Sequence, residues 1–142
     1  MKNIRLLTRA DDAGMNLTAD RAIRSAVKQG IVRNVSLMAP APTAKHAADA
    51  VSDLHHMVDR GLHICLTCEW RNLRWGPVAA AGEVPTLLRE DGTFHHTVKE
   101  LADAGPDLEQ IMKEVAAQSD KLVRLAVQPV YLDEHMLVGS VS

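Results

Sequence analysis

Hydrophobic positions along the chain follow two different periods, and the period changes several times. Short apolar runs rich in β-branched residues predict four strands, within residues 4–12, 31–39, 62–70 and 129–137. Apolar residues at helical spacing, bounded by capping residues, glycine and proline, predict helices within 18–30, 43–61, 97–105 and 106–129. The first strand is expected to be buried, because Ile4, Leu6 and Leu7 form its apolar run.

The alternation of strands and helices predicts the fold class. Strands separated by helical segments are typical of an α/β fold with a parallel sheet and right-handed crossover connections. The near-continuous apolar character of residues 62–70 favours a strand that is covered on both faces. Residues 70–97 carry several glycines and prolines and predict a long loop of a functional kind. No linker or internal repeat interrupts the pattern, so residues 1–142 are expected to form one domain.

Composition and charge exclude several classes of partner. The 142 residues carry 16 Lys and Arg against 18 Asp and Glu, a net charge of −2 that provides no basic surface for nucleic acid. Aromatic residues make up 3% of the chain, too few for a base-stacking platform. No segment approaches the ~20 consecutive apolar residues of a membrane span, and the N-terminal segment does not resemble a signal peptide. We therefore expect a cytoplasmic protein that binds neither nucleic acid nor membranes.

Residues with metal-binding chemistry stand on three of the predicted strands. Active sites of parallel α/β folds lie at the carboxyl ends of the strands. Asp11 and Asp12 end the first strand, His63 lies in the third, and His135 lies near the end of the fourth. Taken singly, the aspartates can cap a helix or face solvent, and each histidine can be a hydrogen-bonded core residue. Taken together, one carboxylate and two imidazoles suit a divalent cation with open positions for water.

Cys65 and Cys68 form a CxxC motif inside the third predicted strand. Residues three apart on a strand point to opposite faces, so the two thiols can neither chelate one metal nor bridge easily. We therefore interpret them as structural cysteines rather than as a redox pair.

Several short motifs together resemble a known family. The segments LLTRADDAGMN, GIVRNVSLMAPAP, GLHICLTCEW, WGPV, EDGTF and YLDEHM resemble, in this order and over nearly the whole chain, the YdjC-like (ChbG/HpnK) carbohydrate deacetylases. That family is similar in fold to the NodB-type polysaccharide deacetylases. The resemblance therefore implies an irregular, parallel (β/α) barrel with a mononuclear metal site.

The resemblance also implies roles for individual residues. Asp12, His63 and His135 match metal ligands, and Asp11 matches the proposed general base. With Mg²⁺ or Zn²⁺ in that site, a water would be activated, Asp11 would take its proton, and acetate would leave an N-acetylated sugar.

Four residues of the long loop are candidates for contacts with a sugar, namely Trp70, Arg71, Arg74 and Trp75. The loop can equally cap the fold or form a subunit contact. The chain departs from the family pattern at four positions, with Ala13 in place of Phe, Glu134 in place of Ser, and Met136 and Leu137 where histidines are common. These changes affect the surroundings of the substrate more than the metal ligands.

The length of the chain limits the prediction. A closed (β/α)₈ barrel needs ~250 residues, and at least ~200, whereas the pattern here supplies four strands. The resemblance is thus to the N-terminal half of a family member with an incomplete barrel-like sheet. We expect either a homodimer in which two half-barrels cover each other or a truncated product that needs its missing half.

Three functional hypotheses remain open. The first is a metal-dependent hydrolase that removes acetyl groups from N-acetylated sugars or oligosaccharides. The second is a non-catalytic metal- or carbohydrate-binding fragment of the same family. The third is a metal-dependent phosphoesterase, which a second cluster of ligands would favour, but the sequence shows no such cluster.

Overall fold

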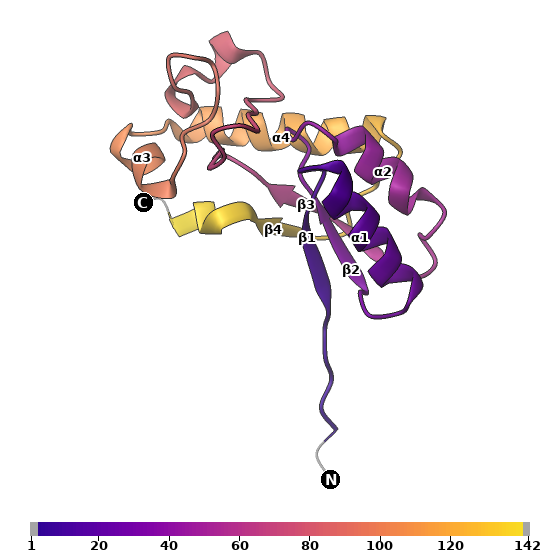
Figure 1. Cartoon of the computed structure of the whole chain (residues 1–142). Coiled ribbons are helices and arrows are strands. Elements are labelled where there is room, and N and C mark those ends of the chain that lie inside the picture. The colour runs from indigo at the N-terminus through magenta and orange to yellow at the C-terminus, as the bar shows by residue number, and fades with distance from the viewer. Residues whose placement is uncertain (1–2, 141–142) are drawn as a thin grey trace.

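The computed structural model describes residues 3–140, and its centre is one parallel sheet (Figure 1). The strands are β1 (Arg9–Ala13), β2 (Asn34–Leu37), β3 (Asp59–Ile64) and β4 (Leu132–Glu134), in the spatial order β1-β2-β3-β4. The helices are α1 (Leu17–Lys28), α2 (Ala44–Ser52), α3 (Val98–Asp103) and α4 (Leu108–Arg124), with short 3-10 turns at Ala81–Glu83, Pro85–Leu87 and His135–Ser140. The prediction of an α/β fold with an incomplete, barrel-like parallel sheet of four strands is confirmed.

The main hydrophobic core lies between one face of the sheet and three helices. Its side chains come from α1, α2, α4 and alternate positions of β2 and β3, among them Ile23, Val27, Val35, Leu37, Val51, Leu62 and Leu122. Because side chains alternate across a strand, Ser36 and His63 face the opposite side of the sheet. The candidate site is built on that second face.

A smaller core holds the segment between β3 and α3. Trp75, Val84, Leu87 and Phe94 are buried together, and Cys65 and Cys68 pack against them as free thiols. This segment, predicted as a long loop, is therefore a packed unit that covers one end of the sheet. None of the helices between residues 3 and 140 is both long and apolar enough to cross a bilayer.

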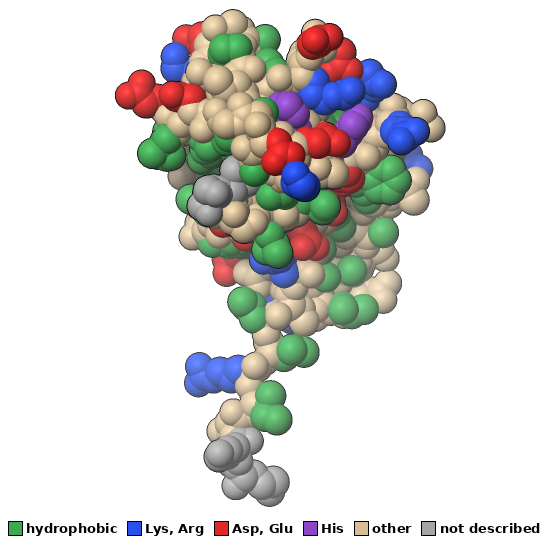
Figure 2. Space-filling model, turned by 90° about the vertical axis from the view of Figure 1, so that its left-hand side faces the viewer, with side chains coloured by type: hydrophobic (Ala, Val, Ile, Leu, Met, Phe, Trp, Pro, Cys, Tyr) green, Lys and Arg blue, Asp and Glu red, His purple; other side chains and the backbone are tan. Residues whose placement is uncertain are grey.

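The N-terminal apolar run does not form the predicted buried strand. Ile4, Leu6 and Leu7 are 92%, 85% and 82% exposed, and Figure 2 shows hydrophobic side chains along an arm that stands clear of the body of the protein. Strand β1 begins only at Arg9, opposite Asn34. No strand in the described part of the chain lies beside the arm, so its apolar side chains have nothing to pack against.

The third strand ends earlier than predicted because, at Cys65, a side chain on α4 takes the place of the neighbouring strand as the hydrogen-bond partner of the backbone. It pairs with β4 up to Ile64, which lies opposite Glu134. At Cys65, the backbone N–H donates to Oε1 of Gln118 at 3.1 Å, and the backbone carbonyl accepts from Nε2 of the same residue at 2.7 Å. The amide of Gln118, on α4, thus satisfies both backbone groups that a further strand residue would have paired.

The other boundaries differ for local reasons. Strand β4 is followed at once by a 3-10 turn in which Met136 and Leu137 have φ of 56° and 57°, outside the strand region. Helix α1 is capped by Asn16, whose side chain accepts the N–H of Ala19, and not by Thr18 as predicted. Helix α2 ends at Ser52 rather than continuing toward Gly61. The predicted starts of α3 and α4 are confirmed, with N-caps at Thr97 and Asp107.

Helix α4 faces the protein with polar residues as well as with apolar ones such as Leu122. Leu108 and Met112, on its predicted apolar stripe, are exposed and line an open apolar groove with Leu132 and Val138. Its buried positions include Glu114 and Gln118.

The buried carboxylate of Glu114 fixes the packed segment to α4. It accepts hydrogen bonds from the backbone N–H groups of Val78 and Ala79 at 2.9–3.1 Å and from the side-chain N–H of Gln118 at 2.8 Å.

We expect Glu114→Gln to lower the free energy of unfolding by about 1–2 kcal/mol, because the amide nitrogen of the new side chain would face hydrogen-bond donors. Urea unfolding measures the change. Glu83→Gln, at an exposed ion pair with Lys113, is the matched control, and equal effects of both variants would contradict the assignment.

Candidate metal centre at the carboxyl ends of the strands

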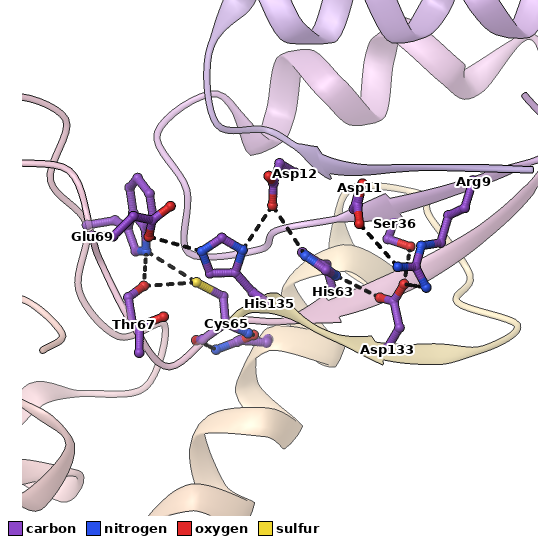
Figure 3. Close-up of polar contacts among 12 residues, drawn as sticks. Arg9, Asp11, Asp12, Ser36, His63, Cys65, Thr67, Glu69, Asp133 and His135 are labelled. Atoms are coloured by element: carbon purple, nitrogen blue, oxygen red, sulfur yellow. Dashed lines mark hydrogen bonds and ion pairs between the residues drawn. The ribbon is translucent and has the colours of Figure 1, made fainter. Parts of the chain in front are cut away.

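The end of β1 is irregular in a way that aims two carboxylates to the same side. Between Ala10 and Ala13, β1 holds one residue more than the facing part of β2, which is a β-bulge. Asp12 lies in the bulge with φ of 59°, in the left-handed region that Asp tolerates better than most residues. Figure 3 shows the carboxyl groups of Asp11 and Asp12 on the side of β1 that faces His63. In a regular strand, two adjacent side chains would point to opposite faces.

Asp12, His63 and His135 converge at the ends of three strands. Oδ1 of Asp12 lies 3.3 Å from Nε2 of His63 and 2.9 Å from Nδ1 of His135. One potential ligand atom from each residue lies within 4.8 Å of the others. Both histidines are buried, and Asp12 is half-buried. The structure thus brings together the three residues that the sequence marks as metal ligands.

Each histidine also contacts a second carboxylate through its other ring nitrogen (Figure 3). Nδ1 of His63 lies 2.8 Å from Oδ1 of Asp133, its direct neighbour in the β3–β4 register. Nε2 of His135 lies 3.0 Å from Oε2 of Glu69, which follows β3 in the chain. Three carboxylates therefore surround two imidazoles.

Asp133 is itself held by two donors from the first two strands. Its Oδ2 accepts from Oγ of Ser36 at 2.7 Å and pairs with Nη1 of Arg9 at 2.7 Å. Oγ of Ser36 also lies 2.9 Å from the hydroxyl of Tyr131. The same arginine contacts Asp11 through Nη2 at 3.1 Å. A continuous set of polar contacts thus connects β1, β2, β3 and β4.

Gly61, on β3, has no side chain and leaves room for the ring of Tyr131, which packs against it. A Cβ atom at Gly61 would lie 2.2 Å from that ring, whereas one at Gly82 would meet nothing within 4 Å. We expect Gly61→Ala to cost about 2 kcal/mol of stability and to displace Tyr131 from Ser36. Thermal unfolding of both variants measures this cost, with Gly82→Ala as the control. An unchanged melting temperature for Gly61→Ala would contradict the proposed close packing.

The electrostatics of the centre favour positive charge. Hydrogen bonds from His135 and His63 hold the pKa of the Asp12 carboxyl well below its usual range. Burial lowers the pKa of His135, but the hydrogen bonds to Asp12 and Glu69 outweigh it and raise this pKa to about 9. Burial raises the pKa of Glu69, but the bond with His135 leaves it lowered overall. At neutral pH, an imidazolium therefore occupies the position between two carboxylates.

Asp11 lies beside the triad rather than in it. Its carboxylate contacts Arg9, its side chain is 51% exposed, and water can reach it. The bulge places it next to the metal-ligand candidate Asp12, and no other contact joins Asp11 to the three converging residues.

The candidate sugar-contact residues occupy three different environments. Trp75 is buried, donates from Nε1 to the backbone carbonyl of Thr67 at 2.8 Å, and packs edge-on against His135 with ring centroids 6.4 Å apart. Trp70 is 49% exposed. The guanidinium of Arg74 pairs with Asp91 at the surface.

Sequence reasoning missed four polar residues of this centre. The sequence pattern does not single out Asp133, Glu69, Ser36 or Arg9. The strand register would have identified Asp133, because it lies directly opposite His63. It would not have identified Ser36, which lies opposite Gly61. Glu69 had no comparable signal, since it lies beyond the end of β3.

The three converging residues fit a divalent cation. Two ligand atoms about 2.1 Å from one ion lie ~3.0–3.4 Å apart in octahedral or tetrahedral geometry. The two distances from Asp12, 3.3 and 2.9 Å, fall in or next to that range. The excess of carboxylates over cationic groups is a further reason for the fit, because buried negative charge needs a counter-charge.

Comparisons with known proteins give relatives that are named carbohydrate deacetylase. The chain is 31% identical over 129 residues to a protein of Geobacillus stearothermophilus named carbohydrate deacetylase, covering 91% of this chain and 48% of the relative. A protein of Danio rerio with the same name is 31% identical over 140 residues, with coverage of 95% and 42%. The chain therefore spans about half the length of the curated relatives it matches.

A solved structure shares the fold. A proposed cellobiose-phosphate cleavage protein from Enterococcus faecalis V583 superposes with a TM-score of 0.84 at 24% identity, covering 98% of this chain and 51% of that chain. The family model described as "YdjC-like protein" matches residues 5–141. The chain therefore belongs to the YdjC-like protein family.

Proposed function

We propose that this protein is a metal-dependent hydrolase that removes acetyl groups from N-acetylated sugars or oligosaccharides. The observation that carries the proposal is the convergence of Asp12, His63 and His135 at the carboxyl ends of β1, β3 and β4. Active sites of parallel α/β folds lie at this edge of the sheet. The relatives named carbohydrate deacetylase give the class of reaction and substrate.

Asp12, His63 and His135 would hold the ion, and Asp11 would act as the general base. A divalent cation in such a site lowers the pKa of a water and polarises a carbonyl oxygen. Asp11 accepts a proton from the attacking water, whose oxygen forms a bond to the acetyl carbon. The carbon–nitrogen bond then breaks, and the amine takes up a proton. The products are acetate and a free amino sugar.

The donor set favours Zn²⁺ over Mg²⁺ as the ion. Two of the three ligands are imidazoles, which suit zinc and other transition metals, whereas Mg²⁺ prefers oxygen ligands. We therefore propose a zinc-type ion, with Mg²⁺ as the alternative to be compared in the assay.

For the sugar, we propose that Trp70 supplies an exposed ring face and that Trp75 forms a wall of the site behind His135. The exposure of Trp70 and the edge-on packing of Trp75 support these two roles. Arg74 would contact a longer oligosaccharide at the surface, after release of its pair with Asp91.

The test is acetate release from N-acetylglucosamine oligomers after removal of metal and re-addition of Zn²⁺ or Mg²⁺. We expect release that requires metal and falls by ~100-fold or more in Asp11→Asn, because general base catalysis contributes ~10²–10⁴-fold. Asp49→Asn, an exposed pair with Lys45 on α2, should leave the rate unchanged. Metal binding without acetate release would contradict catalysis by this chain and support a non-catalytic metal- or carbohydrate-binding role.

We also propose that two copies associate through the open sheet. Within residues 3–140, neither β1 nor β4 has a strand on its outer edge. A half-turn about an axis parallel to the strands would place β4 beside β1 of the second copy with the same direction, giving eight parallel strands and covering the arm with Ile4, Leu6 and Leu7. Light scattering should give twice the mass of the chain, and a monomer at micromolar concentration would contradict this arrangement.

A further inference from the structure

The two histidines of the triad use different ring nitrogens toward Asp12. His63 presents Nε2 and His135 presents Nδ1. A neutral imidazole carries one proton, so only one of its nitrogens has a free lone pair for a cation. A shared ion therefore requires opposite tautomers, with the proton on Nδ1 of His63 and on Nε2 of His135.

A carboxylate stands at each nitrogen that must keep its proton. Oδ1 of Asp133 lies 2.8 Å from Nδ1 of His63, and Oε2 of Glu69 lies 3.0 Å from Nε2 of His135. An ionised carboxylate only accepts hydrogen bonds, so each contact retains the proton on the nitrogen that faces away from Asp12. The two contacts differ in origin, since Asp133 lies on β4 and Glu69 follows β3.

The carboxylate of Asp133 is held in place for this task. Its second oxygen accepts from Ser36 and pairs with Arg9, each at 2.7 Å, and its side chain is 13% exposed. These contacts leave Oδ1 free to accept from His63. Glu69 has a looser environment, with a side chain that is 25% exposed.

We propose that Asp133 and Glu69 are positioning residues that fix opposite tautomers of His63 and His135 and so present Nε2 and Nδ1 to one divalent cation. This inference rests on the metal site of the proposed function. Neither carboxylate is a ligand, and each acts through the histidine it contacts. Outer carboxylates of this kind typically contribute 10–100-fold to metal affinity.

Calorimetric titration of the metal-free chain with Zn²⁺ tests the proposal without any assay of activity. We expect one ion per chain and a ~10- to 100-fold lower affinity in both Asp133→Asn and Glu69→Gln. The matched controls Asp49→Asn and Glu83→Gln remove carboxylates from exposed ion pairs and should bind as the unaltered chain does.

The tautomers can also be observed directly in the unaltered, zinc-loaded chain. Nitrogen–proton correlation spectra of the imidazole rings should show the proton on Nδ1 of His63 and on Nε2 of His135. This measurement decides the matter even if Asp133→Asn does not fold.

The outcomes separate this inference from the proposed function. An unaltered chain that binds no Zn²⁺ contradicts the metal site itself, and the inference with it. Zinc binding that is equally tight in the unaltered chain, Asp133→Asn and Glu69→Gln overturns only the inference, as does the reverse tautomer at either histidine.

Discussion

Asp12→Asn is expected to weaken the binding of a divalent cation by more than ~100-fold while the chain stays folded. Among residues 3–140, the carboxylate of Asp12 is the one anionic group that contacts both His63 and His135, so its charge would be lost at the centre of the triad. Loss of a residue that only orients a ligand costs 10–100-fold, and loss of a ligand should cost more. Calorimetry with Zn²⁺ measures the affinity, and the melting temperature of the metal-free chain reports folding.

Asparagine is the appropriate replacement because of the backbone. Asp12 has φ of 59°, and Asn adopts this left-handed conformation as readily as Asp does. Asp11→Asn, the same change one residue earlier, is the control and should bind the ion as the unaltered chain does, because Asp11 lies outside the triad. Metal binding by Asp12→Asn at the original affinity would exclude the triad as the metal site.

The metal-free protein is expected to lose about 2 kcal/mol of stability between pH 6 and pH 8. The pKa of His135 is about 9 in the folded chain, against about 6.5 when unfolded, so the folded state binds the proton more tightly. Its contribution, about 3 kcal/mol, is fully present below pH ~6.5 and is lost as the pH rises through 9. Urea unfolding in the presence of a chelator at pH 6, 7 and 8 measures the loss.

The unfolding measurements stop at pH 8 because the two cysteines would contribute to the pH dependence of stability above that value. Burial raises the pKa of both Cys65 and Cys68, so above pH 8 thiols released by unfolding would add their own loss of stability. In Glu69→Gln, one of the two hydrogen bonds that raise the pKa of His135 loses its charge, and the loss of stability should shrink to about half. Stability that rises with pH in this range would refute the assignment. With Zn²⁺ present the trend should reverse, since the ion competes with the proton.

The sequence was sufficient to predict the fold class and the three converging residues. Asp12 and His63 are the second-to-last residues of their strands and His135 follows β4, and parallel strands bring their carboxyl ends to one edge. The capping residues were also enough to place the starts of α3 and α4 at their observed N-caps, although α4 ends at Arg124 rather than at Pro129. These features depend on local sequence and on general rules of parallel sheets.

Other features depended on contacts that no local pattern encodes. Strand β3 stops at Ile64 because Gln118, more than 50 residues later, takes over its backbone hydrogen bonds. Ile4, Leu6 and Leu7 read as a buried strand, but burial requires a neighbour that residues 3–140 do not provide. Asp133 is assigned to the centre by the register of β4 against β3, and Glu69 by the path of the chain after β3.

The bulge at the end of β1 makes position 12 subject to two separate requirements. The left-handed backbone at position 12 restricts which residues allow the chain to fold. The need for a carboxylate restricts which residues can bind a metal ion there. In a library of all substitutions, Gly and Asn should rank next to Asp for yield of folded protein, with β-branched residues last. For zinc retention, Asp alone should score highly. Position 12 would then separate the residues that allow folding from the residue that allows chemistry.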